Sequence, residues 1–183
     1  MWYAVQVMTG REETVRDMCK RLIDRKQYND IFVIRFDKAK RYYGTWHKEK
    51  EIMFPGYIFI DSDNPQQIYE HLKSVPELTK MLGRDKNEFT PIEAGKEAMF
   101  KAMVNDNYEI SLSVGIIEGD KVIVKEGPLS GMEVLIKKID RHKRVAVLNA
   151  QMFEQDVDIK IGLEIIEKYK KQKYHKLYMA NKT

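Results

Sequence analysis

Residues 53–60 read Met53-Phe54-Pro55-Gly56-Tyr57-Ile58-Phe59-Ile60. The β-branched and aromatic residues predict a strand, which Pro55-Gly56 interrupts near its start because proline cannot donate a hydrogen bond within a sheet. The segment carries more apolar surface than one short strand normally buries. Two interpretations stay open: the whole segment lies in the core, or the strand starts or bulges near a sheet edge and exposes an aromatic patch to a protein partner.

The segments on either side complete an alternating pattern of strands and helices. Residues 2–8 are apolar and predict a strand, and Thr9 with Glu12 has the capping-box spacing that begins a helix. The further elements, in chain order, are a strand at 31–36, a helix that begins at Asn64-Pro65, a strand within 78–90 and an amphipathic helix through 92–103. The order β-α-β-β-α-β predicts an α+β fold whose first domain is ferredoxin-like.

The sequence divides into two domains. The first spans 1–105, and the loss of periodicity over 106–118 predicts a linker. Residues 119–168 hold short strands separated by Gly/Pro-rich and charged turns, which predict a small all-β barrel. Residues 169–183 form a basic tail without an acidic residue.

The composition excludes several classes of protein. The chain has 183 residues and a net charge of +4, which neither establishes nor excludes a polyanionic partner. Its single cysteine excludes an intrachain disulfide and a multi-cysteine zinc site. The start of the chain lacks the features of a signal peptide, and no apolar run reaches the roughly 20 residues of a membrane helix. We therefore expect a monomeric cytoplasmic protein that does not contact a membrane.

Known catalytic motifs are absent from the sequence. The four histidines have no metal-ligand spacing, and neither a phosphate-binding glycine loop nor a nucleophile elbow occurs. Cys19 lies on the apolar stripe of its predicted helix, where packing is a better explanation than nucleophilic chemistry. We therefore expect no enzymatic activity, no metal and no cofactor.

One stretch concentrates positive charge. Residues 35–50 contain six basic and two acidic residues, interleaved with aromatic rings, and predict a long hairpin loop or an extended β-ribbon. Basic side chains neutralise phosphates while aromatic rings stack on bases, so this stretch is a candidate nucleic-acid site. The alternative is a solvated hairpin with its rings folded back. The candidate residues are Lys38, Lys40, Arg41, Tyr42, Trp46, His47, Lys48 and Lys50 on the hairpin, Arg16 and Lys20 on the first helix, and Lys80.

Several short motifs, taken in their order, resemble those of a known family. They are Trp2-Tyr3-Ala4-Val5-Gln6-Val7, Phe54-Pro55-Gly56-Tyr57, and Ser74-Val75-Pro76 with Gly83 shortly after. This part of the chain resembles the amino-terminal domain of the NusG transcription elongation factors. Downstream, Gly119-Asp120-Lys121-Val122 and Gly127-Pro128-Leu129-Ser130-Gly131 resemble the SH3-like KOW barrel of that family. The resemblance covers residues 2–168.

The resemblance implies a non-enzymatic factor that binds RNA polymerase and suppresses pausing and termination. In the family, the apolar patch around the F-P-G-Y strand grips the clamp helices of the largest polymerase subunit. A neighbouring surface faces the non-template DNA. The polymerase-binding residues that carry over are Tyr3, Val5, Phe54, Pro55, Gly56 and Tyr57.

Two departures from the family pattern indicate a specialised member. The barrel loop that contacts ribosomal protein S10 or termination factor Rho reads Met152-Phe153-Glu154 here and lacks the usual glycine. Residues 79–83, T-K-M-L-G, are similar to the LoaP group of processive antiterminators, which recognise a hairpin in the nascent leader RNA of particular operons.

Three hypotheses remain open. The first is a LoaP-like antiterminator guided by a nascent RNA hairpin. The second is a general elongation factor that couples polymerase to the ribosome or Rho through Met152 and Phe153. The third is an RNA-binding module that uses the barrel alone.

Overall fold

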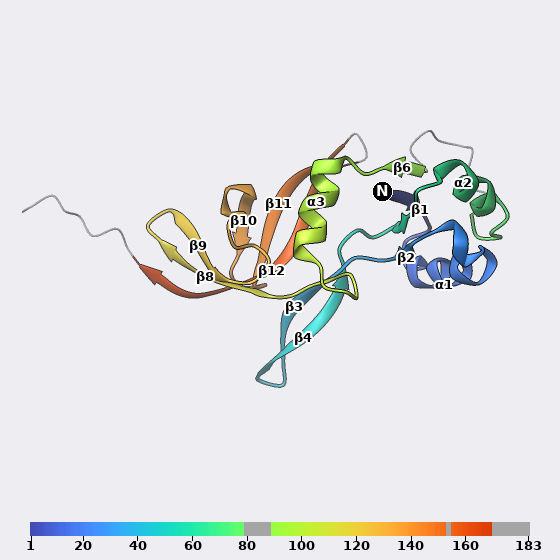
Figure 1. Ribbon diagram of the computed structural model, residues 1–183. Helices are drawn as coiled ribbons and strands as arrows, with labels where there is room; N and C mark the ends of the chain where they lie inside the picture. Colours follow the sequence, from blue (N-terminus) through green and yellow to red (C-terminus); the bar gives the residue numbers. More distant parts are fainter. Residues whose placement is uncertain (79–88, 153–154, 170–183) are drawn as a thin grey trace, which may run out of the picture.

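The computed structural model describes residues 1–78, 89–152 and 155–169 (Figure 1). Its helices are α1 (Glu12–Leu22), α2 (Pro65–Lys73) and α3 (Ala94–Met103), with short 3-10 turns at Arg25–Gln27 and Glu133–Leu135. The strands are β1 (Trp2–Gln6), β2 (Asp30–Phe32), β3 (Arg35–Tyr42), β4 (Thr45–Ile52), β5 (Tyr57–Asp61), β6 (Phe89–Pro91), β7 (Glu109–Ile110), β8 (Ser113–Glu118), β9 (Lys121–Glu126), β10 (Ile136–Asp140), β11 (Val145–Met152) and β12 (Gln155–Tyr169). In this part of the chain, no helix has the length and apolar character needed to cross a membrane.

The first sheet has the strand order β2-β5-β1-β6, with every neighbouring pair antiparallel. This order, with α1 and α2 as the connecting helices, confirms the predicted ferredoxin-like pattern. The predicted strand at 31–36 is divided, because β2 joins this sheet while β3 leaves it to begin a separate hairpin. The expected position of β5 near a sheet edge is wrong, since β5 lies between β2 and β1.

The Phe54-Pro55-Gly56-Tyr57 motif forms a tight turn rather than part of a strand. The Tyr57 N–H donates to the Phe54 carbonyl at 3.2 Å, and Gly56 has a φ of +86°. Proline at the second position and a glycine with positive φ at the third are typical of a type II turn. The motif therefore specifies a backbone shape, and β5 begins only at its last residue.

Glu12 joins this turn to the start of α1, in place of the predicted capping box. Arg11 occupies the N-cap without a side-chain hydrogen bond. The buried Glu12 carboxylate instead accepts the N–H groups of Gly10 at 2.8 Å and Gly56 at 2.7 Å. Burial alone would raise the pKa of Glu12, but the hydrogen bonds from the Gly56 and Gly10 N–H groups lower it below its ordinary value.

Both faces of the first sheet are covered within the chain. One face packs against α1 and α2 through residues such as Val5 and Ile58. The other face, with Trp2, Phe32 and Phe59, belongs to a core cluster that also includes α3 and the second sheet. Figure 1 shows α3 between the two sheets. The surplus of apolar residues in 53–60 is thus used inside the molecule. Ile58 and Ile60 pack against α1 and α2, while Met53, Phe54 and Phe59 lie in the cluster shared with α3 and the second sheet.

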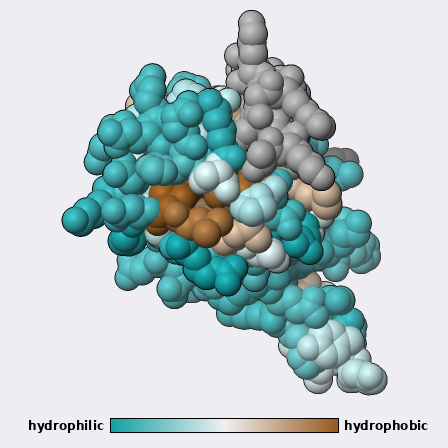
Figure 2. Space-filling model, turned by 90° about the vertical axis from the view of Figure 1, so that its right-hand side faces the viewer, coloured by the Kyte–Doolittle hydropathy of each residue, from teal (hydrophilic) through white to brown (hydrophobic). Residues whose placement is uncertain are grey.

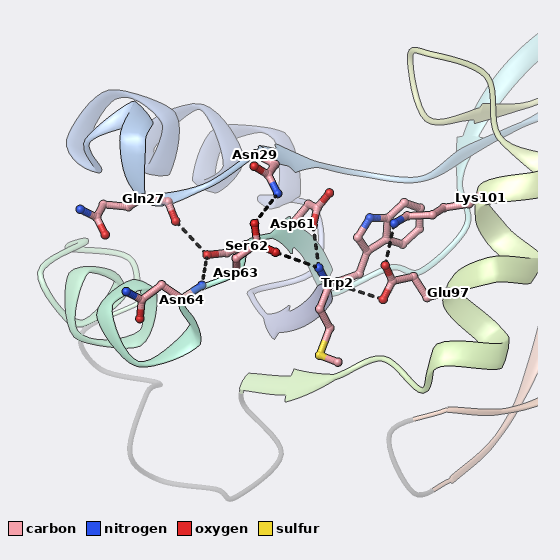
Figure 3. A network of polar contacts seen from close by, with 10 residues as sticks. Trp2, Gln27, Asn29, Asp61, Ser62, Asp63, Asn64, Glu97 and Lys101 are labelled. Carbon is pink, nitrogen blue, oxygen red and sulfur yellow. Dashed lines mark hydrogen bonds and ion pairs between the residues drawn. The ribbon is translucent and has the colours of Figure 1, made fainter.

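Polar contacts hold α3 against the start of β1 (Figure 3). The Trp2 N–H donates to Glu97 Oε2 at 3.0 Å, and Lys101 Nζ pairs with Glu97 Oε1 at 2.7 Å. The same ammonium group lies 5.4 Å from the centroid of the Trp2 ring. Burial raises the pKa of Glu97, but the hydrogen bonds from Lys101 and Trp2 outweigh it and lower the pKa.

The segment 106–118, predicted as a linker, contains ordered structure. Tyr108 stacks on Phe32 with ring centroids 3.6 Å apart, and β7 pairs in parallel with the first residues of β3. β8, at the end of the segment, is a strand of the second sheet. The connection between the first domain and the second sheet is therefore packed against the first sheet rather than solvated.

The second sheet has the order β10-β11-β12-β8-β9, which agrees with the predicted small all-β domain. β12 is one long continuous strand rather than a short one, because it pairs first with β11 and then, in parallel, with β8. In the Gly127–Gly131 motif, Leu129 is fully buried and its N–H donates to Ser113 Oγ at 3.2 Å. The predicted α+β class is confirmed.

Candidate nucleic-acid interface

The β3–β4 hairpin is the most prominent projection in Figure 1. Its strands pair continuously from Arg35 opposite Ile52 to Tyr42 opposite Thr45. The two connecting residues, Tyr43 and Gly44, both have positive φ (50° and 78°), as a type I′ turn requires. The sequence alternative of an extended β-ribbon is therefore the one that the structure adopts.

Ion pairs fix the base of the hairpin to the rest of the chain. Arg35 of β3 pairs with Glu13 of α1, and Lys50 of β4 pairs with Glu109 of β7. With its base held on both strands, the hairpin presents its two faces in fixed directions.

One face of the hairpin is neutralised. The register places Lys38, Lys40, His47, Glu49 and Glu51 on the same side. Lys38 pairs with Glu51, and Lys40 pairs with Glu49 at 3.1 Å. Tyr42 stacks on His47 with ring centroids 3.6 Å apart. On this face the lysines are paired with acids of the hairpin and the two rings lie against each other, which is the geometry that the alternative of a solvated hairpin expects.

The opposite face keeps its positive charge. Toward the tip it carries Arg41, directly opposite Trp46, and Lys48, two residues further along β4; nearer the base it carries Asp37 opposite Lys50. Neither Arg41 nor Lys48 has an ion pair with any residue in the described ranges, and both are exposed. Trp46 as a residue is 41% exposed. This charged face, defined by Arg41, Trp46 and Lys48, combines free cations with an accessible aromatic ring.

The tip of the hairpin adds a further exposed ring. Tyr43 is 97% exposed. Figure 2 shows the hairpin projecting below the body of the molecule, hydrophilic along its length and paler at its tip. A tyrosine with this exposure is available for stacking on a base.

The remaining nucleic-acid candidates do not join this face. Arg16 pairs with Asp17 at 2.8 Å, and Lys20 pairs with Asp30 at 2.7 Å. Their charges are compensated by neighbouring acids, so their assignment as phosphate-binding residues is not supported by geometry. Lys80 lies outside the described residues.

Sequence reasoning missed the cations of the turn between β10 and β11. The Arg144 guanidinium carbon lies 3.5 Å from the centroid of the Trp46 ring. Arg141 and His142 of the same turn line a groove that Trp46 and Arg144 also line. The run Asp140-Arg141-His142-Lys143 predicted only a charged turn, since nothing in the sequence indicates that this turn meets the hairpin.

Most of the expected polymerase-binding residues are buried. Tyr3, Val5, Phe54 and Gly56 belong to the core, and the Phe54 ring lies edge-on to Phe100 of α3 with centroids 5.5 Å apart. The expectation that these four side chains form an open patch is wrong for this arrangement. Val5 lies on the face that α1 and α2 cover, Tyr3 stacks on Phe89, and Phe54 lies in the core cluster shared with α3 and the second sheet.

Part of the same turn is accessible. Pro55 is exposed and Tyr57 is half-buried. Met8, which follows the residue whose N–H donates to the Gly56 carbonyl, is 63% exposed. Figure 2 shows a hydrophobic patch near the centre of the side of the molecule where α1 and α2 lie.

Met152 cannot act as an exposed partner contact in this arrangement. Its side chain is 3% exposed and belongs to the core cluster shared by both sheets. Phe153 lies outside the described residues.

The Cys19 thiol is chemically inert in this fold. It lies on the buried side of α1, and burial raises its pKa to about 12. The thiol is therefore protonated at neutral pH. Within 1–78, 89–152 and 155–169, no three His, Cys, Asp or Glu side chains gather as metal ligands.

Comparison with known proteins places these features in a family. A family model described as "Transcription termination factor nusG" matches residues 1–101. The "Transcription termination/antitermination protein NusG" of Helicobacter pylori is 24% identical over 173 residues, which cover 91% of this chain and 97% of that protein. The protein of the same name from Campylobacter jejuni is 22% identical over 171 residues, which cover 91% and 96%.

Among solved structures, "Domain interaction in Thermotoga maritima NusG" covers 88% of this chain and 92% of that chain, with 21% identity and a TM-score of 0.49. The family model covers more than half of the chain and includes β1, the Phe54-Pro55-Gly56-Tyr57 turn, the hairpin and most of α3. The chain therefore belongs to the NusG family of transcription termination and antitermination factors.

Proposed function

We propose that this chain is a cytoplasmic transcription elongation and processive antitermination factor, which binds RNA polymerase and suppresses pausing and termination. We further propose that a hairpin in the nascent RNA guides it to particular operons. The observation that carries the proposal is the charged face of the β3–β4 hairpin, where Arg41 and Lys48 flank the accessible Trp46 ring. This combination suits a partner that offers phosphates and bases together.

Family membership supports the polymerase part of the proposal. Proteins of the NusG family act with RNA polymerase and are transcription factors without enzymatic activity. Pro55 and Tyr57 are the part of the expected polymerase contact that this arrangement leaves open, and they form an accessible surface at the turn together with the exposed Met8. We assign the clamp helices of the largest subunit to this surface.

The proposed mechanism needs no chemical step. A factor that binds the elongating state of polymerase more tightly than its paused state shifts the population toward elongation. The nucleic-acid contact raises the local concentration of the factor at the transcribing complex, because the two contacts are made by one chain.

Transcription in vitro with purified RNA polymerase tests the proposal. Templates with an intrinsic terminator, with and without a leader that encodes an RNA stem-loop, are transcribed with and without the full chain. We expect more readthrough when the chain is present and a larger gain on the leader-containing template. Unchanged termination on both templates would contradict the antitermination role, and an equal gain on both would contradict guidance by the RNA hairpin.

A general elongation role through ribosomal protein S10 or Rho gains no support from the geometry. Met152 is buried, so this contact would need the second sheet to expose part of its core. Retention of S10 or Rho by the immobilised chain would favour that role over the proposed one.

A further inference from the structure

A groove of about 660 Å³ lies between the hairpin and the second sheet. Trp46 of β4 forms one wall, while the end of β10 and the turn after it form the other. The residues that define it are Trp46, Lys138, Asp140, Arg141, His142 and Arg144. The groove therefore combines residues from both halves of the chain.

The hairpin and the second sheet approach each other closely at two places, one at Trp46 and Arg144 and the other at Asp37 and Gly162. Arg144 lies against the Trp46 ring, and its Nη1 pairs with Glu164 Oε1 of β12 at 2.8 Å. Nearby, a Cβ added to Gly162 would lie 2.1 Å from the Asp37 carbonyl oxygen of β3. Glycine at this position lets the backbones of β12 and β3 approach closely. The hairpin is thereby fixed beside the second sheet.

Positive charge predominates along the groove. Lys138 and Arg141 are exposed, and neither has an ion pair within the described parts of the chain. Asp140 accepts the Lys143 N–H at 3.0 Å, and its other oxygen lies 3.8 Å from Lys143 Nζ, so its charge is partly compensated within the turn. On the hairpin, Arg41 and Lys48 share a face with Trp46 and lie next to the groove, whose lining on this side is Trp46. Cations from two halves of the molecule thus border one aromatic ring.

We propose that this groove binds an unpaired strand of nucleic acid, with its phosphates along the cations of the two walls and its bases against the exposed part of Trp46. A basic groove with an aromatic platform binds single strands without strong sequence preference. In a duplex, neighbouring bases already cover each other's faces, so the indole would have no base to stack on. The inference rests on the proposed function and specifies where the strand lies and that it is unpaired.

Fluorescence anisotropy of the full chain with labelled probes tests the groove. The probes are a short unpaired RNA, a DNA of the same sequence and an RNA stem-loop. The test variant is Lys138→Ala with Arg141→Ala. The control is Lys121→Ala with Lys125→Ala, which also removes two exposed lysine or arginine charges but lies on β9, at the opposite edge of the second sheet.

We expect the test variant to bind the unpaired strands roughly tenfold more weakly than the wild type. Its slope of log affinity against log salt should be less steep by about 1.4, the value for two lost phosphate contacts to a single strand. The control should stay close to the wild type. Tighter binding of RNA would identify the transcript as the ligand, tighter binding of DNA would identify the displaced strand, and either supports the groove.

Trp46 provides a second readout. The protein has two tryptophans, and Trp2 is buried in the core. The fluorescence difference between the wild type and Trp46→Phe therefore reports on the groove. We expect a saturating unpaired strand to quench this difference signal, as base stacking on an indole does. An unquenched signal at saturation would overturn the proposed contact with Trp46.

Three further outcomes would overturn the inference, and they are distinguishable. Weakened binding of the stem-loop by the Lys138/Arg141 variant, with unchanged binding of the unpaired strands, would overturn the ligand class. Wild-type affinity of the Lys138/Arg141 variant, with weakened binding by Arg41→Ala/Lys48→Ala, would overturn the groove and leave the hairpin contact of the proposed function intact. No binding of any probe by the wild type would overturn the nucleic-acid contact of the proposed function itself.

Discussion

The turn at 54–57 and the β3–β4 hairpin are both rich in aromatic residues, yet the first buries a ring in the core and the second exposes one to solvent. Phe54 is 3% exposed, whereas Tyr43 at the hairpin tip is 97% exposed. Phe54 packs against Phe100 of α3 in the core cluster that the second sheet shares, while the hairpin projects away from the body of the molecule (Figure 1). Aromatic content shows that a segment has apolar area to cover, and the neighbouring elements decide whether the chain or a partner covers it.

The hairpin repeats this lesson on a smaller scale. Its two faces carry similar basic side chains, but Glu49 and Glu51 neutralise one face, while no acid pairs with Arg41 or Lys48 among the residues that the structure describes. Whether a basic side chain is neutralised therefore depends on the acids on its own side of the hairpin. A count of charges along the sequence does not distinguish the two sides.

The first prediction tests the contrast between the two aromatic sites. Phe54→Ala removes a buried ring that packs on Phe59 and Phe100, and should lower the free energy of unfolding by about 3–5 kcal/mol. Tyr43→Ala removes an exposed ring and should change it by less than about 0.5 kcal/mol. Urea denaturation followed by circular dichroism measures both. Equal losses would show that the turn is not the more buried site.

The second prediction concerns the carboxylate that supports the turn. Glu12→Gln removes a charged acceptor of two N–H groups, and should lower the free energy of unfolding by about 1–3 kcal/mol at neutral pH. Glu70→Gln on α2, whose side chain is exposed, is the matched control and should have little effect.

The same carboxylate gives the loss a defined pH dependence. The pKa of Glu12 is lower in the folded chain than its ordinary value, so the ionised form stabilises the fold above the unfolded pKa. That stabilisation disappears as the pH falls through the folded pKa. The difference between the wild type and Glu12→Gln should therefore shrink in acid, and a difference that grows in acid would contradict this role.

The third prediction separates the two faces of the hairpin. Arg41→Ala/Lys48→Ala should weaken binding of an unpaired RNA about tenfold and reduce the salt slope by about 1.4. Lys38→Ala/Lys40→Ala removes the same net charge from the neutralised face and should change the affinity much less. Titrations at several salt concentrations compare them. A larger loss for the Lys38/Lys40 pair would reverse the assignment of the faces.

The fourth and smallest effect concerns the hairpin turn. Tyr43 has a φ of +50°, where Asn is tolerated better than Tyr, and Asn-Gly is the preferred type I′ sequence. Tyr43→Asn should therefore raise the free energy of unfolding by up to about 1 kcal/mol. Thermal unfolding measures the change. A loss of stability would show that the Tyr43 ring makes contacts that its exposure does not suggest.

The sequence by itself determined the local elements and the family. Periodicity, β-branched residues and turn residues are properties of neighbouring positions, so the strands, the three helices and the ferredoxin-like order follow from them. The motifs around Phe54-Pro55-Gly56-Tyr57 and Gly127-Pro128-Leu129-Ser130-Gly131 also identified the family, because they specify backbone turns that only a few residue types allow.

Only the tertiary structure decided which of these residues are accessible. The burial of Phe54 and Met152, the pairing of Lys38 and Lys40, and the meeting of Trp46 with Arg144 each depend on elements from distant parts of the chain. Burial and charge compensation depend on distance in space, and a sequence pattern reports only the spacing along one element. For that reason the sequence does not predict the groove between the hairpin and the second sheet, whose walls come from distant parts of the chain.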